Sequence, residues 1–247
     1  MSDLVLTAGV VLVDKPVGPT SFRMVQQVRR AVGIKKVGHA GTLDPFASGL
    51  LVICISRPAT RLISQLMAGD KEYIGVIRLG QETDTLDSQG VIVAQHAVPA
   101  LDRAEIEACL TSFWGLQWQQ PPQFSALKHK GKPLYYYARK GIVVEKEPRQ
   151  ITISALECTY YNEEYLHIRV VCSKGTYIRT LAADIGRSLG CGAYLHQLRR
   201  IRSGPFQVNN AVDGALLAER DSAGQLLRGH MLSVEEALAT LAGPEKD

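Results

Sequence analysis

The chain has 247 residues, of which 46% are hydrophobic and 21% charged, and its formal net charge at pH 7 is +4. This length and composition can bury a sizeable core in one large or two modest domains, so they exclude a chain that is disordered as a whole. The five cysteines are odd in number and form no CxxC pair, which argues against both a disulfide framework and a zinc site.

A helix is predicted near the N-terminus, over residues 20–33. Thr20 or Ser21 caps it, because a short hydroxyl side chain accepts a hydrogen bond from the first free backbone N–H groups, and Gly33 ends it. Its apolar residues recur at helical spacing, which places four of them on one face: Phe22, Val25, Val28 and Val32. We expect this face to pack on the core.

Strands are predicted on either side of this helix and further along the chain. They cover residues 9–16, 50–55, 71–80 and 91–94 and a segment in which Leu166, Ile168 and Val170 alternate with other residues. The turn TDTLDSQG at 83–90 makes a hairpin of the third and fourth strands. Its acids Asp84 and Asp87 are interpreted as turn residues rather than as a catalytic carboxylate pair.

Further helices are predicted over residues 102–110 and 177–190 and twice in the C-terminal forty residues. The helix at 177–190 carries Tyr177, Leu181, Ile185 and Leu189 at intervals of four, so it should pack on the strand that precedes it. Strands and helices alternate irregularly. This order indicates an α+β fold with a mixed sheet.

Charge is distributed unevenly along the chain. Between Ser21 and Arg61 there are seven Lys or Arg residues and one acid, and between Lys128 and Arg149 there are seven bases and two acids. From Ser203 onward, three bases stand against seven acids. A basic body with an acidic tail indicates a polyanionic partner such as nucleic acid, and ordinary solvated surface charge explains the same counts equally well.

The segment 119–149, called the flap from here on, departs from the pattern of the rest. It is rich in proline, lysine and tyrosine, and it shows no clean core period outside residues 135–140. Lysines interleaved with aromatic rings suit an RNA backbone and its unstacked bases. A surface flap whose tyrosines pack beneath it is the alternative that these residues leave open.

Asp44 stands alone in a loop of small residues, GHAGTLDP, that leads into a buried strand. An aspartate before a proline is most often a turn residue, because its carboxylate accepts backbone N–H bonds. The neighbouring glycines also make a compact loop in which a carboxylate can be approached closely. A catalytic role would need a cation to keep the acid ionised and an aromatic surface to hold a planar substrate.

Six stretches of the sequence, in this order, resemble the TruB-type tRNA pseudouridine synthases. They are VVLVDKPVGPTS, GHAGTLDPFASGLL, DKEYIGVIRLGQETDTLDSQG, SALKHKGKPLYYYARKGI, CSKGTYIRTLAADIGRSLGCGAYLHQLRR and IRSGPF. The resemblance runs from about residue 9 to residue 206. It implies the pseudouridine synthase fold, a large, mixed, mostly antiparallel sheet flanked by helices, with the flap as an inserted basic RNA-binding segment.

The resemblance also implies roles for single residues. Asp44 matches the catalytic aspartate, Tyr73 a tyrosine that stacks on the target base and is a candidate for proton abstraction, and Arg179 an arginine that pairs with the aspartate. The residues expected to line the site or bind RNA are Lys15, Pro16, His39, Tyr177, Lys128, Lys130, Lys132, Arg199 and Arg200. Neither a cofactor nor a metal is expected, because the reaction changes neither redox state nor atom count.

The function implied is conversion of the T-loop uridine at tRNA position 55 to pseudouridine, after the base is flipped out of its stack. The expected partner is the tRNA T-arm, with no membrane and no obligatory protein partner, and the enzyme is expected to be a monomer. A guide-RNA-dependent synthase subunit and a non-catalytic tRNA-binding or tRNA-folding protein are the alternatives. The route through C6, C1′ or a glycal stays open.

The predicted domains are a catalytic domain over residues 9–206, which includes the flap, and a short acidic helical extension over residues 207–247. Many TruB proteins carry a PUA domain in this place, and the extension is too short for a full one. A cytoplasmic location is expected, because the first 20 residues lack a signal peptide and no run of about 18 apolar residues occurs. The unpaired cysteines suit a reducing compartment.

Overall fold

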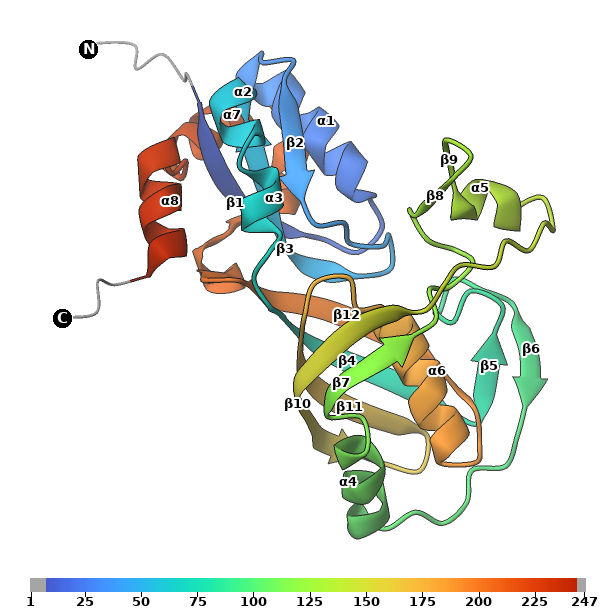
Figure 1. Cartoon of the computed structure of the whole chain (residues 1–247). Helices are drawn as coiled ribbons and strands as arrows, with labels where there is room; N and C mark the ends of the chain where they lie inside the picture. Colours follow the sequence, from blue (N-terminus) through green and yellow to red (C-terminus); the bar gives the residue numbers. More distant parts are fainter. Residues whose placement is uncertain (1–7, 244–247) are drawn as a thin grey trace, which may run out of the picture. The chain divides into compact units, whose positions relative to one another are not determined.

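The computed structural model describes residues 8–243 and divides the chain into two compact units (Figure 1). Unit 1 combines the residues up to Tyr73 with those from Arg199 onward, and unit 2 is Ile74–Leu198. Two strands, β4 (Lys71–Leu79) and β12 (Ala193–Ser203), run from one unit into the other along the chain.

The other elements of unit 1 come from both ends of the chain. They are β1 (Gly9–Lys15), α1 (Ser21–Val32), β2 (Val37–Ala40), β3 (Ser48–Ile55), α2 (Ser56–Thr60), α3 (Ile63–Leu66), β13 (Phe206–Gln207), η1 (Val208–Asn210), β14 (Val212–Asp213), η2 (Gly214–Ala218), α7 (Arg220–Gly229) and α8 (Val234–Ala242). The acidic tail is therefore helical, as predicted. Residues 244–247 of the predicted extension lie outside the described part of the chain.

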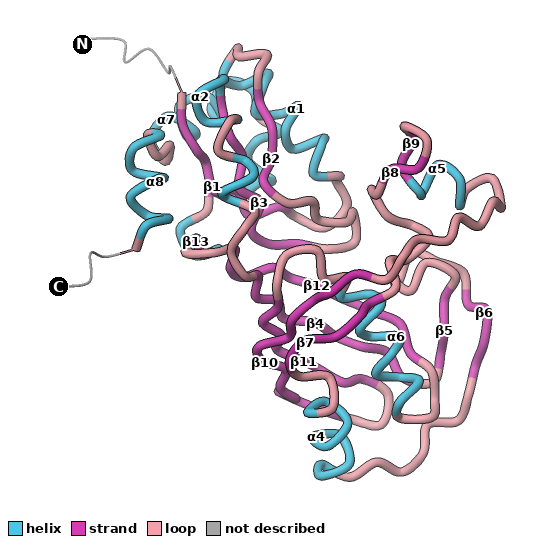
Figure 2. Tube along the Cα trace, viewed as in Figure 1, coloured by secondary structure: helices cyan, strands magenta, loops and turns pink. Residues whose placement is uncertain are grey.

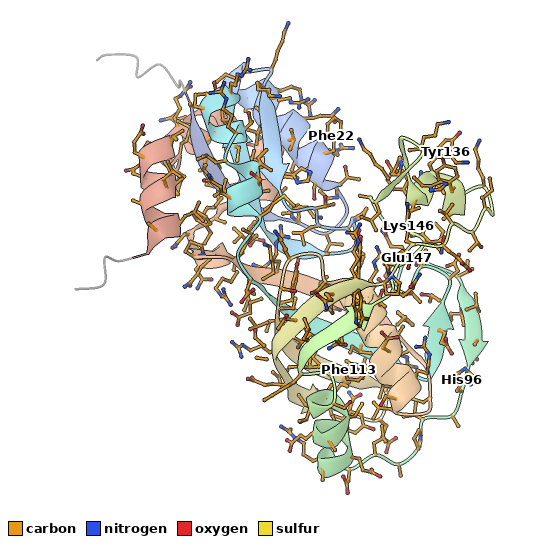
Figure 3. All side chains as sticks on the ribbon, in the orientation of Figure 1. Phe22, His96, Phe113, Tyr136, Lys146 and Glu147 are labelled. Atoms are coloured by element: carbon orange, nitrogen blue, oxygen red, sulfur yellow. The ribbon has the colours of Figure 1, made fainter. Side chains whose placement is uncertain are left out.

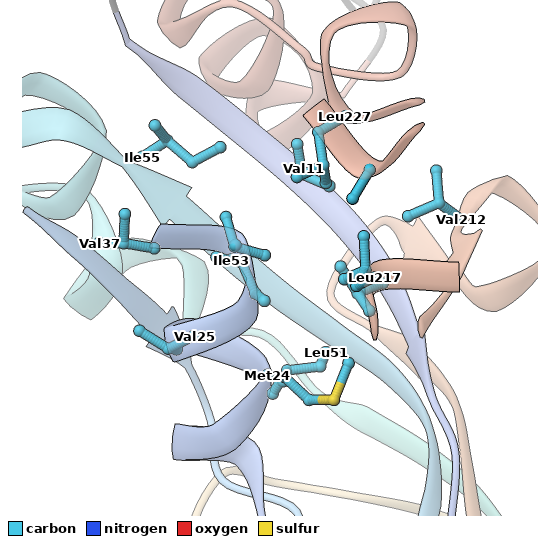
Figure 4. Close-up of a cluster of buried hydrophobic side chains, with 13 residues drawn as sticks. Val11, Met24, Val25, Val37, Leu51, Ile53, Ile55, Val212, Leu217 and Leu227 are labelled. Carbon is cyan, nitrogen blue, oxygen red and sulfur yellow. The ribbon is translucent and has the colours of Figure 1, made fainter. Parts of the chain in front are cut away.

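The strands of unit 1 are covered on both faces. Successive residues of a strand point to opposite faces, and both faces of β1 and β3 are buried, which explains their continuous apolar sequences. One face packs under α1, η2 and α7 (Figure 4), with Val11, Val13, Met24, Val25, Val28, Val37, Leu51, Ile53, Ile55, Val212, Leu217, Ala223 and Leu227. The opposite face packs under α2, α3 and α8, with Val10, Leu12, Ala40, Leu50, Val52, Cys54, Ala59, Leu66, Phe206 and Ala237.

Strand β3 is paired along both of its edges. One edge pairs with β1 in antiparallel register over Gly49–Ile55. The other edge pairs antiparallel with β2 at Val52–Ile55 and then parallel with β12 at Ser48 and Gly49. The loop 41–47 follows β2 in the chain. It therefore lies at the point where the partner of β3 on this edge changes from β2 to β12.

The ends of α1 are as predicted. Thr20 is the N-cap, and its side chain accepts a hydrogen bond from the Arg23 backbone N–H over 3.1 Å. Gly33 follows the helix in the left-handed conformation, with φ of 71°, which glycine adopts without a steric penalty.

The buried face of α1 differs from the prediction. Ser21, Met24, Val25 and Val28 are buried, whereas Phe22 is 54% exposed, on the outer side of the helix (Figure 3). A serine thus occupies the inward position of the first turn, and the helix is rotated so that Phe22 points away from the core. The apolar period alone could not reveal this rotation, because Ser21 reads as polar.

Unit 2 consists of one continuous segment of the chain. Besides its parts of β4 and β12, it contains β5 (Gln81–Thr83), β6 (Ile92–Gln95), α4 (Arg103–Thr111), β7 (Gly115–Gln119), β8 (Lys128–His129), β9 (Lys132–Pro133), α5 (Leu134–Ala138), β10 (Arg149–Tyr161), β11 (Tyr165–Cys172) and α6 (Ile178–Ser188). The long strands β10 and β11 form an antiparallel pair, and β7 lies along the other edge of β10 (Figure 2).

The predicted hairpin has a different first strand. The strand 92–95 pairs with the short β5 in a separate two-stranded sheet and not with β4, which lies between β12 and β11 in the large sheet. Asp102 caps α4 together with Glu105 in a capping box, at the predicted start of this helix. Leu166, Ile168 and Val170 of β11 are buried, as their alternation predicted. Between the end of β7 and the start of β10, the flap contains β8, β9 and α5, which project from the rest of unit 2 (Figure 1).

The predicted fold class, α+β with a large mixed sheet flanked by helices, is confirmed. The predicted domain boundary near residue 206 stays a prediction. Over residues 8–243, no helix is both long and apolar enough to cross a membrane. Within the same range, no three His, Cys, Asp or Glu side chains are grouped so that they could hold a metal ion.

Candidate active site

Asp44 lies, half-buried, in the loop between β2 and β3 of unit 1. Its backbone carbonyl accepts a hydrogen bond from the Ala47 N–H over 3.2 Å, which closes a turn. Its apolar neighbours Leu43 and Phe46 are buried. The loop is therefore a fixed part of the core, and it presents the carboxylate from a rigid base.

Arg200 holds the first part of this loop. Its Nη2 donates to the Gly41 carbonyl over 3.1 Å and its Nη1 to the Thr42 carbonyl over 3.5 Å, while its Nε donates to the Leu50 carbonyl over 2.7 Å. The side chain is 1% exposed. In this structure the Arg200 side chain is bonded to the protein backbone, and its predicted contact with RNA stays a prediction. Its bonds organise the loop.

Lys15 holds the other end of the loop. Its Nζ donates to the carbonyls of Pro16 at 2.8 Å and Pro19 at 2.9 Å and lies 3.5 Å from that of Pro45. Burial lowers the pKa of Lys15 to about 8, while the Asp44 charge acts to raise it and Arg200 to lower it. Lys15 is therefore still mostly protonated at pH 7.

Ser21 holds the residue just before Asp44. Its Oγ donates to the Leu43 carbonyl over 2.9 Å and accepts from the Leu43 N–H over 2.8 Å. The side chain is 2% exposed. Sequence reasoning missed this contact, because it considered Ser21 only as a possible cap, and the cap turned out to be Thr20.

The other predicted residues of unit 1 lie in different settings. His39, on β2, has its pKa lowered by burial and then by the Arg200 charge, so its ring is neutral at pH 7. Tyr73 is 9% exposed. Arg199 makes a bidentate pair with Asp14, with N–O distances of 3.0 and 2.6 Å, and stays 42% exposed. Its predicted contact with RNA stays a prediction.

Arg179 and Tyr177 belong to unit 2, at the start of α6. Arg179 donates to the carbonyls of Thr85 at 2.9 Å and Phe124 at 2.7 Å, and its Nη1 lies 3.4 Å from the Asp87 carboxylate. Gln119 bonds both backbone groups of Tyr177, at 2.7 and 3.0 Å. The guanidinium is therefore held in one place by the 83–90 turn and by the flap.

Asp87 is a residue whose surroundings the sequence did not reveal. It is 5% exposed, and one carboxylate oxygen accepts from the Thr85 hydroxyl over 2.7 Å and the Gln89 N–H over 3.0 Å. It thus orders the turn, as predicted, and it also pairs with Arg179. The sequence offered one indication of this role, the two acids of the TDTLD stretch. That stretch alone could not show that Asp87 pairs with Arg179, which lies far away in sequence.

The flap carries exposed charge over aromatic rings. Lys128, Lys130 and Lys132 are all exposed. The ring of Tyr136, labelled in Figure 3, has the ammonium groups of Lys132 and Lys140 at 4.3 and 4.6 Å from its centroid. Hydrogen bonds from Lys140 and then Lys132 lower the pKa of Tyr136 to about 8. Lysine and tyrosine thus form one polar surface.

Two family models match the chain. "TruB family pseudouridylate synthase (N terminal domain)" matches residues 29–178, and "tRNA pseudouridylate synthase B C-terminal domain" matches residues 179–239. The chain is 52% identical over 240 residues to the tRNA pseudouridine synthase B of Desulfotalea psychrophila, which covers 95% of this chain and 97% of that protein. It is 47% identical over 230 residues to that of Chlamydia trachomatis serovar L2, covering 89% and 94%.

Solved structures resemble the chain as well. A chain from "Crystal Structure of a Cbf5-Nop10-Gar1 Complex" superposes with a TM-score of 0.71 at 28% identity, over 95% of this chain. One from "Structure of H/ACA RNP bound to a substrate RNA containing 2'-deoxyuridine" gives 0.68 at 25% identity, also over 95% of this chain. This chain spans 63% and 62% of those two chains. The fold is therefore similar to that of these two chains.

Proposed function

The chain belongs to the TruB family of pseudouridylate synthases, and we propose that Asp44 is its catalytic residue, acting on the T-loop uridine at tRNA position 55. The enzyme is a tRNA pseudouridine synthase, an isomerase. The observation that supports Asp44 is the number of buried side chains that hold the backbone of its loop. An ordinary surface turn has no need of three such side chains.

The reaction suits a single carboxylate. The N1–C1′ bond of uridine breaks, the uracil turns, and a C5–C1′ bond forms, so atoms and electrons balance without a cofactor. An ionised aspartate can attack C6 of the base or C1′ of the sugar, or assist a glycal route through loss of the C2′ proton. The attraction between Lys15 and Asp44 favours the ionised carboxylate.

The remaining roles follow the family resemblance. Tyr73 stacks on the loose uracil and is a candidate for proton abstraction, while Tyr177 lines the same pocket. Arg179 pairs with Asp44 in the reacting complex. Because the target base is hidden in a stacked loop, it must first be flipped out, at a cost of a few kcal/mol. His39 helps to open the T-loop, and its neutral ring is suited to insertion among bases.

The flap supplies part of the RNA binding that offsets this cost. Its exposed lysines suit phosphates, and its tyrosines offer flat faces to unstacked bases. We infer that the enzyme works as a monomer without guide RNA or partner protein, in the cytoplasm. The higher sequence identity to proteins named for tRNA than to chains from multi-protein complexes supports the stand-alone form.

The direct test is an assay on an unmodified tRNA transcript with no guide RNA. We expect stoichiometric pseudouridine at position 55, located by chemical mapping after incubation with the purified chain. A transcript with cytidine at this position is the matched control and should gain no pseudouridine. Conversion at another uridine, or only after a guide RNA is added, would contradict the proposed function.

Replacing Lys128, Lys130 and Lys132 together by glutamine should weaken tRNA binding and flatten its salt dependence. Each phosphate contact contributes about 0.7 to 0.9 to the slope of log K against log salt, so three contacts would lower the slope by about 2.1 to 2.7. The dissociation constant measured at several salt concentrations gives this slope.

The matched control also removes three positive charges, two from other parts of unit 2 and one from the C-terminal tail. Arg103, Arg187 and Arg228 are exposed and have no proposed RNA contact. Their triple glutamine variant should keep a slope within about 0.5 of the wild-type value. If both triple variants lose the same slope, net charge rather than the flap is responsible.

A further inference from the structure

The Asp44 loop is held by three buried side chains, and Ser21 differs from the other two. Lys15 and Arg200 are cations that only donate: Lys15 bonds one carbonyl oxygen of the loop, that of Pro45, and Arg200 bonds those of Gly41 and Thr42. The Ser21 hydroxyl donates and accepts, and it bonds both the C=O and the N–H of Leu43. Two bonds to one residue fix the orientation of its backbone as well as its position.

The bonded residue directly precedes the carboxylate. Leu43 is 3% exposed and Ser21 is 2% exposed, so water does not replace the hydroxyl when it is removed. Ser21 also belongs to the first turn of α1, whose inner face packs on the strands of unit 1. The hydrogen bond between Ser21 and Leu43, which are 22 residues apart in sequence, thus connects the loop to a helix that packs on the core of unit 1.

We propose that Ser21 is a positioning residue for Asp44. This inference rests on the proposed function, since it requires that the Asp44 carboxylate meet the substrate. Catalytic groups must be held within about 0.5 Å and 10–20° of their productive geometry. A free rotation of the Leu43 backbone would move the Asp44 side chain by more than this while leaving the RNA-binding surface intact.

If Ser21 positions Asp44, its removal should lower the rate of the reaction without weakening the binding of tRNA. In Ser21→Ala, the single-turnover rate constant at saturating tRNA should fall by about 10- to 100-fold, because a misplacement of about 1 Å costs this much. The dissociation constant for tRNA should stay within about twofold, since Ser21 is buried and touches no RNA.

Thr20→Ala is the matched control. Thr20 is the adjacent hydroxyl, it is exposed, and it bonds the Arg23 N–H of the same helix and no part of the loop. Its loss weakens the start of α1 in the way that any lost cap does. We expect a lower melting temperature and a single-turnover rate constant within about twofold of the wild-type value.

A second variant covers the case in which Ser21→Ala does not fold. Ser21→Cys replaces the hydroxyl by a larger thiol that retains a weak donor and acceptor, so its rate constant should lie between those of alanine and serine. All rates are compared at a temperature at which circular dichroism shows every variant folded. A rate within twofold of wild type in Ser21→Cys and Ser21→Ala, or an equal loss in Thr20→Ala, would overturn the proposal.

The same measurements separate this proposal from the proposed function. If the wild-type chain forms no pseudouridine, or if Asp44→Asn retains full activity, the proposed function fails and the role of Ser21 fails with it. If wild type is active and Asp44→Asn is inactive, a normal rate in both Ser21 variants contradicts the positioning role alone. A loss of binding in place of rate contradicts it as well.

Discussion

Asp44→Asn should abolish pseudouridine formation, with a fall in the single-turnover rate constant of about 10³-fold or more. The amide has nearly the same shape as the carboxylate but lacks the charge and the nucleophilic oxygen, so the loop should fold as before. Binding of tRNA should therefore stay within several fold. Rate and binding are measured on the same unmodified transcript at one salt concentration.

Asp70→Asn is the control for this prediction. Asp70 is an exposed acid of the same unit, and its backbone carbonyl accepts a hydrogen bond from the Gly204 N–H over 2.8 Å, which the change leaves in place. The same chemical change there should leave the rate within about twofold, because a surface substitution rarely alters the fold. Substantial turnover by purified Asp44→Asn would remove Asp44 from the chemistry.

Gly49→Ala should cost about 3 kcal/mol or more of the free energy of unfolding of the chain, because its Cβ has no room. Gly49 has φ of +102°, and a Cβ there would lie 2.2 Å from the Arg200 carbonyl oxygen and 2.7 Å from its nitrogen. Both are backbone atoms of the paired strand β12, so neither can rotate away. The substitution must separate β3 from β12 beside the Asp44 loop, and urea-induced unfolding measures the loss.

Gly33→Ala measures the part of this loss that comes from the positive φ angle, without the steric clash. Gly33 also has a positive φ, of +71°, but no heavy atom lies within 4 Å of the position that an alanine methyl group would occupy. This variant should lose about 1 to 2 kcal/mol, which is the cost of the left-handed conformation alone. Equal losses in the two glycine variants would show that the close approach of β12 is not what requires glycine at Gly49.

The sequence was sufficient to predict features that depend on neighbouring residues, such as helix ends and buried strands. A hydroxyl before a helical period and a glycine after it predicted both ends of α1. Continuous apolar runs predicted β1 and β3, because strands buried on both faces leave no polar alternation. The Asp44 loop was recognised from its glycines and from its order among five other motifs, and the family comparisons agree with that resemblance.

Contacts between residues far apart in the chain were decided by the tertiary structure. The family resemblance placed Arg200 among the residues expected to line the site or bind RNA, but its bond to the Leu50 carbonyl, 150 residues away in sequence, could only be seen in the structure. Phe22 looked like a core residue because its spacing fits the apolar face, yet the packing of Ser21 turns it outward.

The sequence by itself determined the class of the fold from the order of its strands and helices, and its resemblance to a known family determined the candidate carboxylate, because motifs in the same order can be compared without a structure. Which side chains hold that carboxylate in place was decided only by the tertiary structure. A serine or an arginine has the same local propensity whether it is buried or exposed, and its hydrogen-bond partner depends on which loop the folded strands bring beside it. For Ser21 and Arg200, that partner is the backbone of the loop that carries Asp44.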